Sequence, residues 1–156
     1  MLFLKLSTRG RYGLRAMFDL AMNQSQGPIP LNEIASRQNI SEAYLEQLFA
    51  NMRKAGLVKS VRGARGGYLL ATTPDKISVG QILRTLEGNI APADCVRDDH
   101  DGIECTSADA CVTRIVWEKI RDSVNQVIDS ITLEDMVREQ RLINKRTEYT
   151  NVQCNS

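Results

Sequence analysis

Apolar residues recur at steps of three and four between positions 7 and 23, and this spacing predicts an amphipathic helix. Ser7 or Thr8 is a suitable N-cap, and the segment QGPIP ends the helix. Four basic residues stand at its start: Lys5, Arg9, Arg11 and Arg15. Helix N-termini favour phosphate and arginine adds forked donors, so this end of the helix predicts contact with a polyanion.

Two more amphipathic segments follow, joined by a tight polar turn. The first covers residues 31–38, and the second runs from the N-cap Ser41 to Gly56, where a left-handed C-cap would end it. A short helix, a turn of a few residues and a longer helix form the helix-turn-helix arrangement. Because helical hairpins are common, this pair alone leaves DNA binding and a purely structural role equally open.

Two short runs of β-forming residues, at 57–61 and 68–72, flank the turn RGARGG and predict a β-hairpin, or wing, directly after the second helix. Arg62 and Arg65 stand at its tip among glycines, on a backbone thin enough to enter a minor groove. The turn lacks the GxxxxGK[ST] pattern of a nucleotide-binding loop. The wing therefore strengthens the prediction of DNA binding.

Residues 73–88 predict a further helix that closes this winged domain, and Gly88 ends it. Beyond a polar loop, residues 112–131 carry an apolar stripe about five helical turns long. The stripe consists of Val116, Trp117, Ile120, Val124, Val127, Ile128 and Ile131. Little chain remains to cover it, so the same helix of a second subunit is the economical partner, with packing onto the winged domain as the alternative.

The predicted fold class is mostly α with a small β-hairpin: a winged helix-turn-helix domain plus a long dimerisation helix. The expected divisions are a DNA-binding domain at 1–89, a cysteine loop at 90–111, dimerisation helices at 112–144 and a disordered tail at 145–156. Thr132 opens the last helix with a capping box. Cys154, in the polar tail, is expected to be a bystander.

The net charge of +1 hides an asymmetry along the chain. Residues 1–90 contain twelve Lys or Arg against six Asp or Glu, whereas residues 91–156 contain eight against thirteen. A basic first part predicts a polyanion partner, with solvated surface as the plain alternative. No apolar stretch approaches the ~20 residues that cross a bilayer, and the opening MLFL precedes no cleavage pattern. We therefore expect a cytoplasmic protein with no membrane partner.

Three cysteines share one polar loop with the spacing C-x9-C-x5-C: Cys95, Cys105 and Cys111. In a chain without an export signal, clustered cysteines are more often thiolate ligands or redox groups than a disulfide framework. They fit the soft ligands of an iron–sulfur centre, and with His100, the single histidine, they would also satisfy tetrahedral zinc. A cysteine enzyme would need a positioned base, which one histidine in an acidic loop supplies poorly, so no enzyme is expected.

Four stretches of the chain carry a resemblance to a known family. They are KLSTRGRYGLRAMFDLA at 5–21, ISEAYLEQLFANMRKAGLVKSVRGARGGYLL at 40–70, ISVGQILRTLEG at 77–88, and the segment from Trp to ITLEDMV at 117–137. With these stretches the chain resembles the winged-helix transcription regulators typified by the iron–sulfur cluster regulator IscR. The nitric-oxide sensor NsrR and the cysteine-metabolism regulator CymR are relatives in that family.

The resemblance implies a homodimer on double-stranded operator DNA, with the second helix of the motif in the major groove and the wing in the minor groove. Ala43, Glu46 and Gln47 match the recognition helix, and Arg62 matches the wing arginine. Gln47 could bind adenine through its amide, whereas Glu46 could accept from cytosine, repel phosphate or have only a structural role. The full set of residues predicted to bind DNA is Lys5, Arg9, Arg11, Ala43, Tyr44, Glu46, Gln47, Arg53, Lys59, Arg62 and Arg65.

The resemblance also implies an iron–sulfur cluster on the three loop cysteines, [2Fe-2S] in preference to [4Fe-4S], with cluster-assembly proteins as candidate partners. Arg114 and Arg11 occupy the positions where relatives keep the fourth ligand, and the first gap between cysteines is nine residues instead of five. His100 lies in the enlarged gap and is the candidate fourth ligand. Two alternatives stay open: a regulator of the cysteine-metabolism type that senses through a partner protein, and a loop stapled by zinc.

Overall fold

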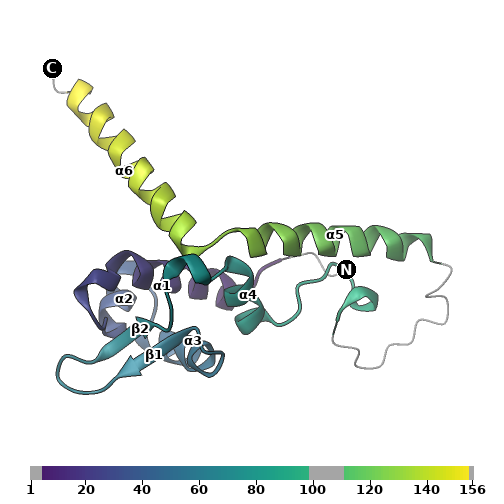
Figure 1. Cartoon of the computed structure of the whole chain (residues 1–156), viewed down its shortest axis with the longest axis horizontal. Helices are drawn as coiled ribbons and strands as arrows, with labels where there is room; N and C mark the ends of the chain where they lie inside the picture. Colours follow the sequence, from purple (N-terminus) through teal and green to yellow (C-terminus); the bar gives the residue numbers. More distant parts are fainter. Residues whose placement is uncertain (1–4, 99–110, 155–156) are drawn as a thin grey trace.

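The computed structural model describes residues 5–98 and 111–154 (Figure 1). The helices are α1 (Thr8–Asn23), α2 (Leu31–Gln38), α3 (Glu42–Lys54), α4 (Val79–Glu87), α5 (Val112–Ser130) and α6 (Leu133–Cys154). The strands are β1 (Val58–Val61) and β2 (Gly67–Leu70), and the short 3-10 turns are η1 (Gln24–Gln26), η2 (Pro74–Lys76) and η3 (Asp94–Val96). The predicted fold class, mostly α with a small β-hairpin, is confirmed.

The helix starts follow the capping residues that the sequence predicts. The hydroxyl of Ser7 accepts from the backbone N–H of Arg9 at 3.2 Å, and that of Ser41 accepts from Tyr44 at 3.2 Å. At α6, Thr132 and Asp135 cap each other, because each backbone N–H donates to the other side chain, at 2.9 and 3.2 Å. These bonds satisfy N–H groups that a helix leaves without intrahelical acceptors.

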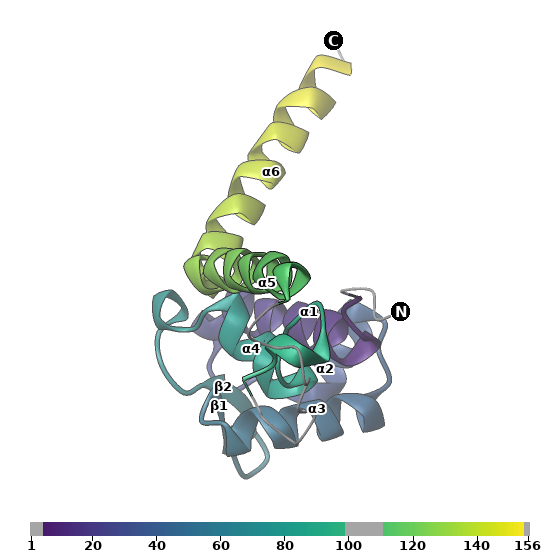
Figure 2. The same cartoon turned by 90° about the vertical axis from the view of Figure 1, so that its right-hand side faces the viewer.

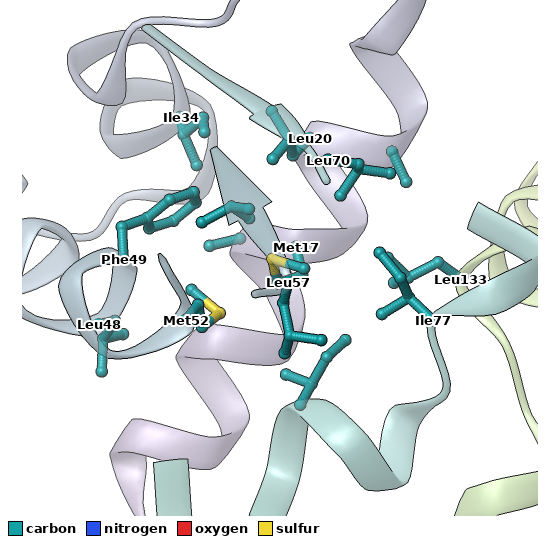
Figure 3. Packing of buried hydrophobic residues seen from close by; sticks show 14 of the residues in the cluster. Met17, Leu20, Ile34, Leu48, Phe49, Met52, Leu57, Leu70, Ile77 and Leu133 are labelled. Carbon is teal, nitrogen blue, oxygen red and sulfur yellow. The ribbon is translucent and has the colours of Figure 1, made fainter. Parts of the chain in front are cut away.

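The buried core lies among α1, α2, α3 and the wing, with α4 and the start of α6 closing it (Figure 3). Figure 3 shows Phe49 and Met52 of α3 directed toward Met17 of α1, and all three are fully buried. Leu133 of α6 joins the same cluster at 0% exposure. The first turn of α6 is therefore part of the winged domain, although it follows the long helix α5 in the sequence.

Two glycines let α1 and α4 approach each other closely. A Cβ atom on Gly13 would lie 2.0 Å from Leu86 Cδ1, and one on Gly10 would lie 2.4 Å from Glu87 Oε1. Both distances are far below van der Waals contact, so a larger residue at either position would displace the Leu86 or Glu87 side chain. Gly10 and Gly13 thus allow α4 to place these side chains directly against α1.

The wing is an antiparallel hairpin in which Val58 pairs with Leu70 and Val61 with Gly67. Its second strand is also bonded to the segment between α1 and α2. The N–H of Ile29 donates to the carbonyl of Tyr68 at 2.9 Å, and the N–H of Tyr68 donates back at 2.8 Å. The wing is therefore anchored to the domain on both sides of β2.

Among the described residues, helix α5 packs mainly against α4 and η3. Val124 and Ile128 pack against a small apolar cluster made by Val79, Leu83 and Ile90. These two residues of the stripe therefore pack on the winged domain, as the alternative prediction expects. None of the residues of α5 is buried. The rest of the stripe is exposed: Val116, Trp117, Ile120, Val127 and Ile131.

The end of the chain differs from the prediction of a disordered tail at 145–156. Helix α6 continues to Cys154, and both views show it projecting away from the winged domain (Figure 1 and Figure 2). Residues 133–154 contain neither Gly nor Pro, so nothing in this segment interrupts a helix once the capping box has started it.

We predict that Gly13→Ala destabilises the protein, although alanine usually favours a helix over glycine by about 1 kcal/mol. The added methyl group would overlap Leu86, so we expect a loss of about 1–3 kcal/mol in the free energy of unfolding, measured by urea denaturation. As a control, Ser36→Ala at an exposed position of α2 should change stability by no more than about 0.5 kcal/mol. A Gly13→Ala protein as stable as the wild type would contradict the close packing of α1 on α4.

Candidate nucleic-acid interface and metal centre

Helix α3 presents a solvent-exposed face opposite its buried one. Ala43, Glu46 and Gln47 are exposed and lie three and four residues apart, so they share this outer face. The inner face is buried in the core and consists of Leu45, Leu48, Phe49 and Met52. The residues predicted to read bases are therefore open to a partner.

The wing lies beside α3, and both are on the side of the molecule away from α5 and α6 (Figure 1 and Figure 2). At its tip, Gly63 has a φ of +112°, a region that residues with a Cβ rarely adopt. A Cβ on Gly66 would lie 2.3 Å from the carbonyl oxygen of Val61. These glycines allow the tight turn that displays Arg62 and Arg65. All basic residues predicted to bind DNA are exposed: Lys5, Arg9, Arg11, Arg53, Lys59, Arg62 and Arg65.

Tyr44 is held differently from the other predicted DNA-binding residues. Its side chain is half-buried and packs against the core. Its ring meets that of Tyr12 edge to face, with centroids 6.2 Å apart and an interplanar angle of 87°. The aromatic body of Tyr44 thus joins α3 to α1.

The N-terminus of α1 is capped by a carboxylate of its own chain, which sequence reasoning missed. Glu87 Oε1 accepts from the N–H of Ser7 at 2.8 Å, the hydroxyl of Ser7 at 2.5 Å and the N–H of Gly10 at 2.9 Å. The predicted attraction of this helix end for phosphate is wrong in this respect, because these backbone donors are already used. Among the described residues, the exposed side chains of Lys5, Arg9 and Arg11 offer positive charge there.

Two of the three loop cysteines are among the described residues. Cys95 is in η3 and Cys111 is the residue before α5, and both are half-buried free thiols. Cys105 and His100 lie outside the described residues. Within residues 5–98 and 111–154, no three His, Cys, Asp or Glu side chains gather closely enough to hold a metal ion.

Hydrogen bonds from neighbouring residues lower the pKa of the Cys111 thiol. Its Sγ lies 3.0 Å from Thr113 Oγ1, and this hydrogen bond is the main cause that lowers the pKa of Cys111. A backbone hydrogen bond from Arg114 lowers it further. Because the thiolate is the form that binds metals, this environment fits a soft metal centre. Arg114 itself pairs with Glu118 at 3.0 Å.

Segment 90–96, which carries Cys95, is bonded to α5 at both ends. Arg121 donates to the carbonyl of Val96 at 2.9 Å, and Asn125 donates to the carbonyl of Ile90 at 3.3 Å. Hydrogen bonding to Asp122 is the main cause that raises the pKa of Arg121, so its charge is secure. No sequence pattern marks Arg121 or Asn125, because their acceptors are backbone carbonyls distant in the sequence.

Helix α5 is in turn bonded to α4. Arg84 donates to Asn125 Oδ1 at 2.9 Å and forms an ion pair with Asp129. A Cβ on Gly80 would lie 2.0 Å from Asp129 Oδ1, so a side chain at residue 80 would displace this carboxylate from its present position beside Arg84. The part of the chain that the structure describes contains no helix suited to crossing a membrane.

Comparison with known proteins gives consistent matches over most of the chain. The Rrf2 family, described as iron-dependent transcriptional regulators, matches residues 6–139. CymR of Bacillus subtilis (strain 168), an HTH-type transcriptional regulator, is 47% identical over 133 residues, which cover 85% of this chain and 89% of the relative. A solved structure of CymR, the global cysteine regulator of B. subtilis, has a TM-score of 0.72 and 48% identity and covers 89% of this chain and 98% of that one.

Proteins named IscR match to a similar degree. IscR of Pectobacterium atrosepticum, also an HTH-type transcriptional regulator, is 37% identical over 141 residues, 90% of this chain and 84% of the relative. The solved structure of T. potens IscR has a TM-score of 0.71 and 51% identity and covers 87% of this chain and 88% of that one. The two names thus stand at comparable similarity to this chain.

We predict that Cys111 forms its thiolate at a lower pH than an ordinary thiol in the metal-free protein. The other three cysteines are replaced by serine, and the rate of iodoacetamide alkylation is followed against pH. Thr113→Val removes the hydroxyl that bonds to Sγ, so the midpoint should move to higher pH. Ser123→Ala, at an exposed position of α5, should leave it unchanged. An unchanged midpoint in Thr113→Val would contradict the assigned cause.

Proposed function

The chain belongs to the Rrf2 family of transcriptional regulators, and from this premise we propose that it is a homodimeric, sequence-specific DNA-binding regulator controlled by an iron–sulfur cluster. The cluster would be held by Cys95, Cys105 and Cys111, and its presence would set the affinity for the operator. The observation that carries this proposal is that segment 90–96, with Cys95, is bonded directly to α5, the helix with the exposed apolar stripe.

DNA binding is proposed for the face made by α3 and the wing. The exposed Ala43, Glu46 and Gln47 would lie in the major groove, where the Gln47 amide can bind adenine and Glu46 can accept from cytosine. Arg62 at the wing tip would enter the minor groove, where guanidinium groups are attracted to the strong negative potential. Lys5, Arg9, Arg11, Tyr44, Arg53, Lys59 and Arg65 would contact the phosphate backbone.

Dimerisation is proposed through α5. Val127 is 56% exposed and Val116 is 49% exposed, and a helix with such a stripe gains stability by burying it against a second copy. Two recognition helices in one dimer must match half-sites about 34 Å apart, so their spacing decides whether both bind. A shift of α5 would alter this spacing.

The cysteine loop begins with segment 90–96 and ends at Cys111, immediately before α5, so a metal centre there would connect the two. The two described thiols suit an iron–sulfur cluster, because both are free and the pKa of Cys111 is lowered. When bound, the cluster supplies a centre that is gained or lost with iron supply or oxidation. Arg121 and Asn125 would pass the resulting change in the loop to α5.

The fourth ligand is proposed to be His100, with [2Fe-2S] favoured over [4Fe-4S]. Arg114, at one position where relatives keep the ligand, is engaged with Glu118, and Arg11 at the other is a cation. A site of this kind would be loaded by cluster-assembly proteins in the cytoplasm.

A second candidate function is a regulator of the cysteine-metabolism type that responds to a partner protein and holds no cluster. The similarity to B. subtilis CymR, at 47% identity, favours it. A structural zinc ion on the same thiols would be a third arrangement, since three cysteines and one histidine suit tetrahedral zinc. Metal content separates these candidates from one another.

We predict that protein purified without oxygen is coloured and contains about two iron and two sulfide per chain, as a [2Fe-2S] centre requires. Cys111→Ala should lose the visible absorption and the iron, whereas Cys154→Ser, the matched control, should keep both. Mössbauer and EPR spectra of His100→Ala should differ from those of the wild type. Colourless protein with stoichiometric zinc would favour the zinc-stapled loop, and protein free of metal would favour the cysteine-metabolism type.

We predict that Arg62→Ala weakens binding to all duplex DNA, because a phosphate or groove contact from the wing is lost. The slope of log affinity against log salt should fall by about 0.9 for one lost ionic contact, measured by fluorescence anisotropy. Arg141→Ala removes the same charge from an exposed position of α6 and should leave the slope unchanged. Equal slopes for wild type and Arg62→Ala would contradict a DNA contact by this arginine.

A further inference from the structure

Arg15 is the fourth basic residue at the start of α1, and by charge it resembles the residues that would bind phosphate. Its side chain is nevertheless engaged within the domain. Nη2 donates to the backbone carbonyl of Gln38 at 2.7 Å, and Nε donates to Gln38 Oε1 at 3.3 Å. The guanidinium also lies over the ring of Tyr12, 5.6 Å from its centroid. Arg15 therefore joins α1 to the last residue of α2.

The side chain of Gln38 is held from its other end as well. Its Nε2 donates to Asp19 Oδ2 at 2.9 Å, and Asp19, only 4% exposed, also forms an ion pair with Arg37 at 2.7 Å. Arg15 and Asp19 are one helical turn apart on α1. Both side chains therefore bond to Gln38 at the end of α2. The hydrogen bond to Asp19 is also the main cause that raises the pKa of Arg37.

Gln38 immediately precedes the turn of the helix-turn-helix motif. Asn39 follows with a φ of +53°, in the left-handed region, and Ser41 caps α3 two residues later. Because the last carbonyls of a helix lack intrahelical donors, the bond from Arg15 satisfies one that would otherwise need water. The ring of Tyr12, over which the Arg15 guanidinium lies, also contacts the ring of Tyr44 in the first turn of α3. Arg15 thus bonds directly to the end of α2 and lies over Tyr12, whose ring contacts the start of α3.

We propose that Arg15 is a positioning residue for sequence recognition: it fixes the angle of α3 through Gln38 and Tyr12, instead of neutralising a phosphate. This inference rests on the proposed function, in which α3 reads the operator. Planar, forked donors and a stacking face are properties of arginine that lysine lacks. The role therefore depends on the shape of the guanidinium and not on its charge.

The two roles differ in their effect on different DNA sequences. A lost phosphate contact weakens binding to every duplex and lowers the salt slope by about 0.9. A misplaced recognition helix weakens binding to the preferred sequence, because base contacts require close geometry. It does not change the number of ionic contacts to phosphate. Specific affinity, non-specific affinity and salt slope therefore separate the two roles.

The test compares wild type, Arg15→Lys and Arg15→Ala on two 30-base-pair probes. One is the duplex that anaerobically purified wild-type protein enriches from a random library, and the other is its shuffled counterpart. For both variants we expect at least a tenfold loss on the enriched duplex, about the size of one lost base contact, with unchanged affinity for the shuffled duplex and an unchanged salt slope. Thermal unfolding of both proteins confirms that they are folded, and Arg15→Lys keeps the charge and most of the exposed stem.

Three results would overturn the role of Arg15 alone. The first is that both variants retain the wild-type preference for the enriched duplex. The second is an equal loss on both duplexes with a salt slope lower by about 0.9, which marks a phosphate contact. The third is retention by Arg15→Lys with loss in Arg15→Ala, which would show that charge suffices. A wild-type protein with no preference for any duplex would overturn the proposed function, and the role of Arg15 with it.

Discussion

The close packing of α4 between α1 and α5 is the constraint on which the rest of the structure depends. On one side Leu86 and Glu87 occupy the space that side chains at Gly10 and Gly13 would fill. On the other side Asp129 of α5 occupies the space above Gly80. Because well-packed contacts without voids transmit strain instead of absorbing it, a displacement of α5 is expected to reach α1 through α4.

This arrangement gives a physical basis for coupling the cysteine loop to the DNA-binding face. Cys95 lies in a segment bonded to Arg121 and Asn125, and Cys111 immediately precedes α5, so both described thiols are attached to that helix. At the far end, α1 holds the end of α2, the first helix of the helix-turn-helix pair, through Arg15 and Asp19. A centre that orders the loop would thus act on the same helix that a second subunit is proposed to cover.

Local patterns in the sequence were sufficient to predict the fold, but not its long-range contacts. Helical spacing and capping residues such as Ser41 identified the helix-turn-helix pair, and the glycine-rich turn identified the wing, because each depends on neighbouring residues. The cap that Glu87 provides for Ser7 spans 80 positions, and spacing cannot reveal such a contact. The charge of Arg15 predicted a phosphate contact, whereas its acceptor is a helix terminus brought near by folding. The cluster could be predicted only from residue types, since Cys105 and His100 lie outside the described residues.

We propose that an iron–sulfur cluster sets the affinity for DNA, and the most direct measurement is the dissociation constant for the enriched duplex before and after the cluster is removed from one sample. Air oxidation followed by chelation under denaturant-free conditions removes it, and the visible absorption reports the extent of removal. We predict that the dissociation constant changes at least about tenfold, equivalent to about 1.4 kcal/mol of coupling between the two sites. The same dissociation constant with and without the cluster would contradict it.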